Sequence, residues 1–163
     1  MVFNILDVSF LNLRSEILLH TFENKDIYVY GMSLGSHMAT NSVYQLQKKE
    51  AFAGLILEVP FDNLMNVVRL AVPVPLPLEV IMRDKYDNLA MIENIKSPIL
   101  IMGGSIDTTV PVELAQNLYN YAPEPKKIII YENGKHSNLF NFRNDLDILD
   151  WMKANENGWL KSE

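Results

Sequence analysis

The sequence contains no cysteine, which excludes a disulfide framework, a thiolate metal site and a cysteine nucleophile. Basic residues are also scarce: 14 lysines and arginines stand against 20 acidic residues, giving a net charge of −6. The nearest approach to a basic cluster is the pair Lys48 and Lys49. Because phosphate binding needs a concentrated basic surface, nucleic acid is not an expected partner.

Long apolar runs are missing too. The N-terminus MVFNILDVSFLNLRSEILLH is interrupted by Asp7, Arg14 and Glu16, and it lacks the basic start and small-residue cleavage site of a signal peptide. No run approaches the roughly 18 apolar residues that a membrane-spanning helix requires. We therefore expect a cytoplasmic protein with no transmembrane segment. Its 163 residues, 48% of them hydrophobic, fit a single domain with a real core over 1–163.

Four short apolar runs predict strands that are buried on both faces, because none alternates polar with apolar residues. They span residues 27–30, 55–59, 99–102 and 128–131. Before, between and after them, apolar residues recur at helical spacing. These stripes are Leu6, Phe10, Leu13 and Ile17; Met38, Ala39, Val43 and Leu46; Leu114, Leu118 and Tyr121; and Leu139, Phe142, Leu146 and Leu149. The alternation predicts an α/β fold with a parallel sheet flanked by helices.

An insertion at about 60–96 interrupts this alternation. It contains VPVPLPLEVIM, where prolines at alternate positions disfavour both a helix and a central strand. Such a segment is either a lid or binding loop, or a surface crossover that happens to be apolar. We favour the lid. Its bulky side chains predict an apolar acyl or leaving group in the substrate; they are Met65, Val72, Val74, Leu76, Leu78 and Ile81.

The motif GMSLG places Ser33 between Gly31 and Gly35, after an apolar strand and before a helix. This is the context of a nucleophile elbow, in which a serine occupies a sharp turn that leaves no room for side chains at the two glycines. The helix N-terminus favours developing negative charge, and the N–H of Leu34 is the natural first oxyanion donor. The alternative is a serine in an ordinary glycine-bounded turn.

A serine nucleophile needs a base and an acid. Of the three histidines, His20 and His37 fall on helices that are poorly placed for Ser33, whereas His136 follows the last strand. The acid candidate is Asp107, which follows the third strand; it could instead be a cap or turn residue, and Asp62 is a rival acid. Such loops meet at the carboxyl edge of a parallel sheet.

The segments GMSLG, LILEVPFDNL, SPILIMGGSIDTTVP with LAQNLY, and GKHSN together resemble the α/β-hydrolase superfamily. The likeness is strongest to its serine aminopeptidase-like and monoacylglycerol-lipase-like branch, and it covers roughly residues 20 to 155. The resemblance implies that Ser33 is the nucleophile, His136 the base and Asp107 the acid that orients it. It implies an ester, thioester or amide hydrolase that forms an acyl-enzyme and needs no cofactor.

The family fold has further strands before the nucleophile strand, and the sequence predicts only a helix there. Strand 27–30 is therefore expected to be an exposed edge open to self-association or to a partner. The loop that gives the second oxyanion donor would also be missing. The chain is then either a serine hydrolase or an incomplete, non-catalytic module that another chain completes. A third alternative is a small-molecule binding domain of different fold, which would be supported if Ser33, Asp107 and His136 lie far apart in space. No metal-ligand spacing or phosphate-binding loop is present.

Overall fold

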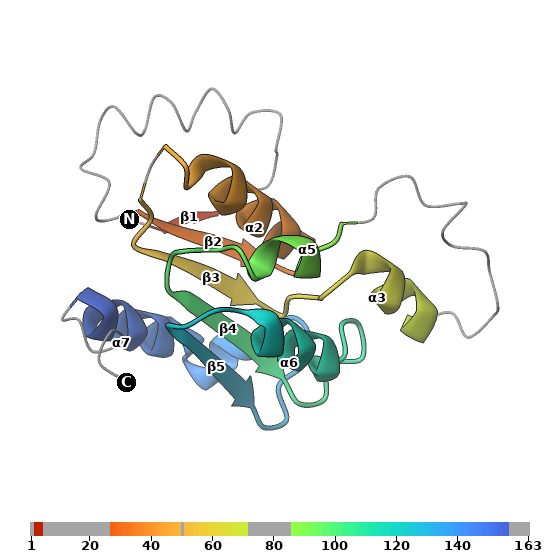
Figure 1. Ribbon diagram of the computed structural model, residues 1–163. Coiled ribbons are helices and arrows are strands. Elements are labelled where there is room, and N and C mark those ends of the chain that lie inside the picture. The colour runs from red at the N-terminus through yellow and green to blue at the C-terminus, as the bar shows by residue number, and fades with distance from the viewer. Residues whose placement is uncertain (1, 5–26, 50, 72–85, 157–163) are drawn as a thin grey trace.

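The computed structural model describes residues 2–4, 27–49, 51–71 and 86–156. Their strands form one sheet in the order β1-β2-β3-β4-β5, and every neighbouring pair is parallel (Figure 1). The strands are β1 (Val2–Asn4), β2 (Tyr28–Met32), β3 (Gly54–Glu58), β4 (Ile99–Gly104) and β5 (Lys126–Tyr131). The parallel α/β sheet predicted from the four apolar runs is confirmed.

Burial on both faces holds only in the middle of the sheet. Every residue of β3 and of β4 is buried, as a continuous apolar run predicts. In β5 only Tyr131 is buried, because this strand lies at an edge and one side of it has no neighbouring strand among the described residues. The prediction of full burial was therefore wrong for the run 128–131.

Strand 27–30 is not an exposed edge. Val29 of β2 is in register with Phe3 of β1 on one side and with Leu55 of β3 on the other. The prediction of an open edge at 27–30 was wrong, because β1 pairs along it, whereas self-association or binding of a partner chain stays a prediction. At three residues, β1 is too short to leave a periodic signal, so no pattern in the residues predicts a strand before β2.

Helices cover the sheet on both faces (Figure 1). On one side lie α2 (Leu34–Leu46), α5 (Leu89–Ile92) and α6 (Val112–Tyr121), and α7 (Asn144–Glu156) lies on the other. Alternate residues of each strand point to the two sides. In β3, Leu55 and Leu57 pack with Val43 of α2, whereas Ile56 packs with Trp151 of α7.

The last apolar stripe was misassigned. Residues 139–142 form a 3-10 helix, η2 (Leu139–Phe142), and Arg143 then takes a left-handed conformation with φ of 61°. This break changes the phase of α7. Leu139 and Trp151 are buried, whereas Leu146 and Leu149 remain 45% and 48% exposed. The stripe that was expected to face the core is therefore partly on the surface.

The described part of the insertion is helical and well anchored. It contains α3 (Leu64–Ala71) and α5, and its two ends meet where Asn63 and Asp87 form an antiparallel bridge. The proline-rich stretch, with Val72 to Ile81, lies outside the described residues, as does the helix predicted over Leu6 to Ile17. Among the helices that the structure describes, none is both long and apolar enough to cross a bilayer.

Candidate active site

Ser33 occupies a strained turn between β2 and α2. Its φ of 52° and ψ of −119° are unusual for a residue with a side chain, and such strain gathers at functional sites. Backbone bonds hold the turn: the Ser33 N–H donates to the carbonyl of Glu58 at 2.9 Å, and the Ser33 carbonyl accepts from the Ser36 N–H at 2.9 Å. The elbow geometry expected from GMSLG is present at this position.

Gly31 allows α2 to approach β2 closely. A Cβ at Gly31 would lie 2.3 Å from the carbonyl oxygen of Gly35 and 2.7 Å from the Cβ of Ala39. Both contacts are with α2, so the steric demand at Gly31 comes from the helix. Small residues on the buried face of α2, Ser36 and Thr40 among them, maintain this close packing.

His136, Asp107 and Ser33 form a continuous hydrogen-bonded chain. The Nε2 of His136 lies 3.0 Å from the Oγ of Ser33, and its Nδ1 lies 2.8 Å from Oδ2 of Asp107. The Asp107 side chain is 1% exposed and that of His136 is 22% exposed. A buried carboxylate therefore faces one nitrogen of the ring, and a serine hydroxyl faces the other.

Asp107 makes both of the contacts that the sequence offered as alternatives. While Oδ2 faces His136, Oδ1 accepts the backbone N–H groups of Thr109 at 2.8 Å and Val110 at 2.9 Å. The carboxylate thus holds its own turn and the histidine together. Because the turn fixes the side chain, little rotational freedom remains to be lost when the ring is held.

The loops that carry Asp107 and His136 touch each other at Gly104. A Cβ there would lie 2.4 Å from the carbonyl oxygen of Gly134, and that oxygen also accepts the N–H of Ile106 at 3.0 Å. Gly104 is the last residue of β4, and Gly134 follows β5 by three positions. The close approach of these glycines brings the two loops within side-chain reach.

The rival candidates have other contacts. Asp62 is buried and accepts both Nδ2 of Asn66, at 3.0 and 3.1 Å from its two oxygens, and Nδ2 of Asn117, at 2.7 Å. The Nδ1 of His37 lies 3.0 Å from Oδ1 of Asn88, and burial lowers the pKa of His37 below its ordinary value. His20 lies outside the described residues.

Glu58 is a buried acid that the sequence reasoning passed over. It ends β3, is 6% exposed, and its Oε2 accepts the Tyr30 hydroxyl at 2.6 Å and Nδ2 of Asn144 at 2.8 Å. Burial raises the pKa of Glu58, while these two hydrogen bonds and the charge of His136 oppose that rise. The available signal was a carboxylate that ends the apolar run LILE, since an acid on a buried strand needs partners.

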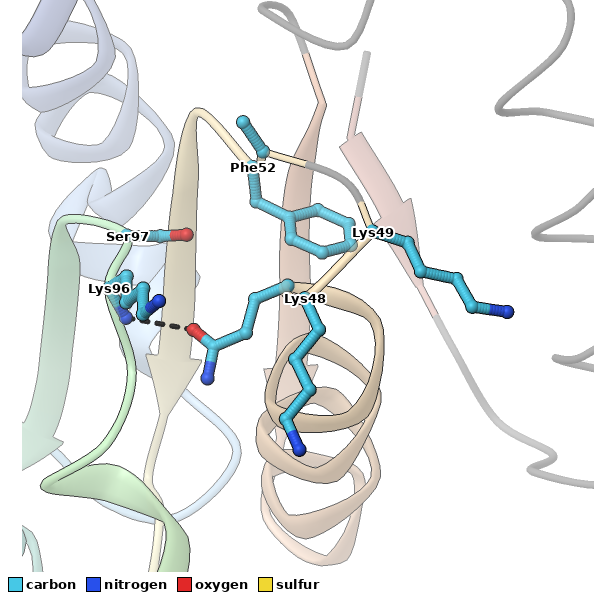
Figure 2. A pocket seen from close by; sticks show the side chains of 7 residues that line it. Lys48, Lys49, Phe52, Lys96 and Ser97 are labelled. Carbon is cyan, nitrogen blue, oxygen red and sulfur yellow. Dashed lines mark hydrogen bonds between the residues drawn. The ribbon is translucent and has the colours of Figure 1, made fainter.

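A pocket of about 320 Å³ lies at the opposite edge of the sheet from Ser33, before the first residues of β3 and β4. Figure 2 shows the Lys48 and Lys49 side chains extending in different directions, so their charges do not converge on one ligand. The lining residues are Gln47, Lys48, Lys49, Ala51, Phe52, Lys96 and Ser97. Across the part of the chain that the structure describes, no group of three or more metal-ligating side chains could hold an ion.

The parallel sheet and its flanking helices form part of the α/β-hydrolase fold. The structure resembles 2,6-dihydroxy-pseudo-oxynicotine hydrolase with a TM-score of 0.69 and 22% identity, over 90% of this chain and 46% of that one. It also resembles the acetyl xylan esterase of Paenibacillus sp. R4 with a TM-score of 0.67 and 18% identity, over 90% of this chain and 52% of that one.

Sequence relatives agree with this fold. The chain is 31% identical over 124 residues to an uncharacterized protein of Mycobacterium tuberculosis, which covers 76% of this chain and 40% of the relative. It is 30% identical over 129 residues to the lysophosphatidylserine lipase ABHD12 of Mus musculus, with 64% of this chain and 31% of the relative covered. The chain spans two fifths or less of the length of these curated relatives. No family model matches it. The structural likeness shows the α/β-hydrolase fold, and the lipase among the relatives supports a member of that superfamily that contains part of the fold.

Proposed function

We propose that the chain carries the catalytic triad of a serine hydrolase that cleaves an ester, thioester or amide bond through an acyl-enzyme. Ser33 is the nucleophile, His136 the general base and Asp107 the acid that orients the histidine. The observation that supports this most strongly is the chain of contacts from Ser33 Oγ to His136 Nε2, at 3.0 Å, and from His136 Nδ1 to Asp107, at 2.8 Å. Such a chain gives a serine the base that it needs for attack.

In this mechanism, His136 Nε2 takes the Ser33 proton as Oγ bonds to the carbonyl carbon of the substrate. The carbonyl oxygen gains the negative charge, and the N–H of Leu34 at the start of α2 donates to it. When the tetrahedral intermediate collapses, the bond to the leaving group breaks, and His136 returns the proton to that group. Water then gives a proton to His136 and attacks the acyl carbon. The bond between that carbon and Ser33 Oγ breaks, the acid product leaves, and His136 returns the proton to Ser33. Asp107 remains a carboxylate throughout.

An apolar acyl group is the substrate feature that we favour. Exposed apolar side chains lie close in sequence to each member of the triad: Leu34 is 49% exposed, Ile106 is 45% exposed and Phe140 is 69% exposed. Exposed apolar side chains near a site favour a hydrocarbon chain over a charged substrate. The lipase among the relatives acts on a lipid, as its name says. The lid over 60–96 and the cytoplasmic location stay predictions.

The second candidate is an incomplete hydrolase module that becomes active only when another chain, or a second copy, completes it. The observation in its favour is the share of the curated relatives that the chain spans, which is 40% or less. Under this alternative the triad is the same, but the second oxyanion donor comes from elsewhere. Losing one such donor costs about 10²–10³ in rate.

Labelling with a fluorophosphonate probe, read by intact mass, separates the two candidates. We expect one adduct on the wild-type chain and none on Ser33→Ala or His136→Ala. Ser42→Ala is the matched control, because Ser42 lies on the same helix and its Oγ donates to the Met38 carbonyl at 2.7 Å. A folded wild-type chain that takes no label would overturn the self-sufficient enzyme. If the label appears only in a fraction whose mass in solution is twice that of the chain, the incomplete module is favoured.

A further inference from the structure

Glu58 connects the two halves of the candidate active site. Its backbone carbonyl accepts the N–H of Ser33 at 2.9 Å, and its side chain accepts the hydroxyl of Tyr30, which lies on the nucleophile strand β2, at 2.6 Å. The same carboxylate oxygen accepts Nδ2 of Asn144 at 2.8 Å, from the first residue of α7. One buried residue therefore contacts the serine turn and the helix that follows the histidine loop.

The start of α7 depends on these contacts for its position. Arg143, with its left-handed backbone, separates α7 from η2, so α7 does not continue rigidly from the histidine loop. Two polar contacts attach its first turn to the sheet. Asn144 bonds to Glu58 of β3, and Asp147 Oδ2 accepts the hydroxyl of Tyr131 of β5 at 2.7 Å. The loop that carries His136 lies between these attachment points and the end of β5.

The backbone after Glu58 is strained. Val59 is a buried, β-branched residue with φ of 44°, a conformation that such residues rarely adopt. Its N–H donates to the carbonyl of Met102 at 2.7 Å, which fixes the end of β3 against β4. Strain of this kind persists only where the surroundings determine the geometry closely. The site of Glu58 is therefore held firmly in place.

We propose that Glu58 is a positioning residue: its carboxylate holds the start of α7, and with it the loop of His136, against the strand that carries Ser33. This role rests on the proposed function. Glu58 does not touch the reacting atoms in it, and the 3.0 Å contact between His136 and Ser33 is what it maintains. Displacing a catalytic group by about 1 Å can cost about 10²-fold in rate.

Two substitutions at Glu58 separate its hydrogen bonds from its charge. In Glu58→Gln the side-chain carbonyl can still accept both Tyr30 and Asn144, because one oxygen accepts both in the native chain. We expect the rate of fluorophosphonate labelling to stay within about threefold of wild type. Glu58→Leu keeps the volume and removes both acceptors, and we expect labelling to slow about tenfold to 10²-fold. Equal losses in the two variants would overturn positioning.

A matched pair of asparagines controls for the general cost of a lost buried hydrogen bond. Asn144→Ala removes a bond to Glu58, and Asn117→Ala removes a bond of 2.7 Å to the buried carboxylate of Asp62, which is not a member of the proposed triad. We expect Asn144→Ala to slow labelling at least about tenfold and Asn117→Ala to leave it within about twofold. Both should remain folded by circular dichroism. Equal rates in the two variants would refute the proposal.

A second readout keeps this inference separate from the proposed function. The downfield proton resonance of the hydrogen bond between His136 Nδ1 and Asp107 reports the position of the ring without any chemistry, and His136→Ala assigns it. We expect the signal to weaken or vanish in Asn144→Ala and to persist in Asn117→Ala. If the wild-type chain shows the resonance but takes no label, the proposed function fails. The resonance in Asn144→Ala and Asn117→Ala then still tests whether Glu58 positions the ring. If Asn144→Ala retains both resonance and labelling rate, positioning is wrong.

Discussion

Substituting Gly31 by alanine should damage the candidate active site more than it damages the fold. The new Cβ would lie 2.3 Å from the carbonyl oxygen of Gly35, whereas real Cβ atoms essentially never come closer than 3.0 Å to a neighbour. The neighbour is backbone, so no side chain can rotate away. Strand β2 and helix α2 must separate by at least about 0.7 Å. Ser33 lies between them and must move as well.

Overpacking of this kind costs about 1–3 kcal/mol of unfolding free energy. For a chain of this size that corresponds to a fall in Tm of roughly 2–12 °C. A displacement of this size at the nucleophile should slow fluorophosphonate labelling by about 10²-fold. Gly103→Ala is the control, since its Cβ would meet side-chain atoms alone: Ile130 and Val112 at 3.3 Å and Ala115 at an ordinary 3.7 Å. A Gly31→Ala chain with wild-type Tm and labelling rate would show that a Cβ at this position does not displace Ser33.

Three further substitutions each test the contacts of one side chain. Asp107→Asn keeps the oxygen that holds its turn but disturbs the bond to His136, so labelling should fall by about 10³–10⁴-fold with little change in Tm; a loss under tenfold would contradict the assigned role. Burial lowers the pKa of His37 in the folded chain. As pH drops below about 6.5, this imidazole is therefore protonated in the unfolded chain before it is protonated in the folded chain, and the free energy of unfolding decreases. The Tm of His37→Gln should therefore fall less than that of the wild type between pH 7 and 5. Parallel curves of Tm against pH for the two chains would contradict this prediction. Lys126→Met removes an ammonium group that donates to the carbonyls of Ala122 at 2.8 Å and Tyr119 at 2.9 Å, near the C-terminus of α6. It should lower the free energy of unfolding by about 1 kcal/mol and leave labelling unchanged; an unchanged Tm would show that these contacts add no stability.

Local patterns were enough to predict the central strands and the order of the candidate triad. The runs around Leu57 and Ile101 are apolar on both faces because both faces are covered, and that requirement is visible in the residues themselves. The elbow was predictable for a similar reason, because Gly31 is dictated by a backbone contact only four residues away. The meeting of Asp107 with His136 followed from topology, since both follow parallel strands.

Features that depend on distant contacts were not predictable. The edge position of β5 is set by which strands pair, and its residues 128–131 are as apolar as those of a buried strand. The break at Arg143 arises from a left-handed turn at a residue that gives no such signal, and it moved Leu146 out to the surface. The carboxylate of Glu58 accepts a hydrogen bond from Asn144, which lies 86 positions further along the chain. A single sequence does not show such pairs.

Trapping the acyl-enzyme tests directly whether Ser33 is the nucleophile. The purified chain is mixed with the p-nitrophenyl ester of a short apolar acid, quenched in acid at successive times and digested for mass spectrometry. We expect one acyl group on the peptide that contains Ser33. It should accumulate with the first equivalent of p-nitrophenol and be absent from Ser33→Ala. An acyl group on another residue, or ester hydrolysis that persists undiminished in Ser33→Ala, would contradict the account.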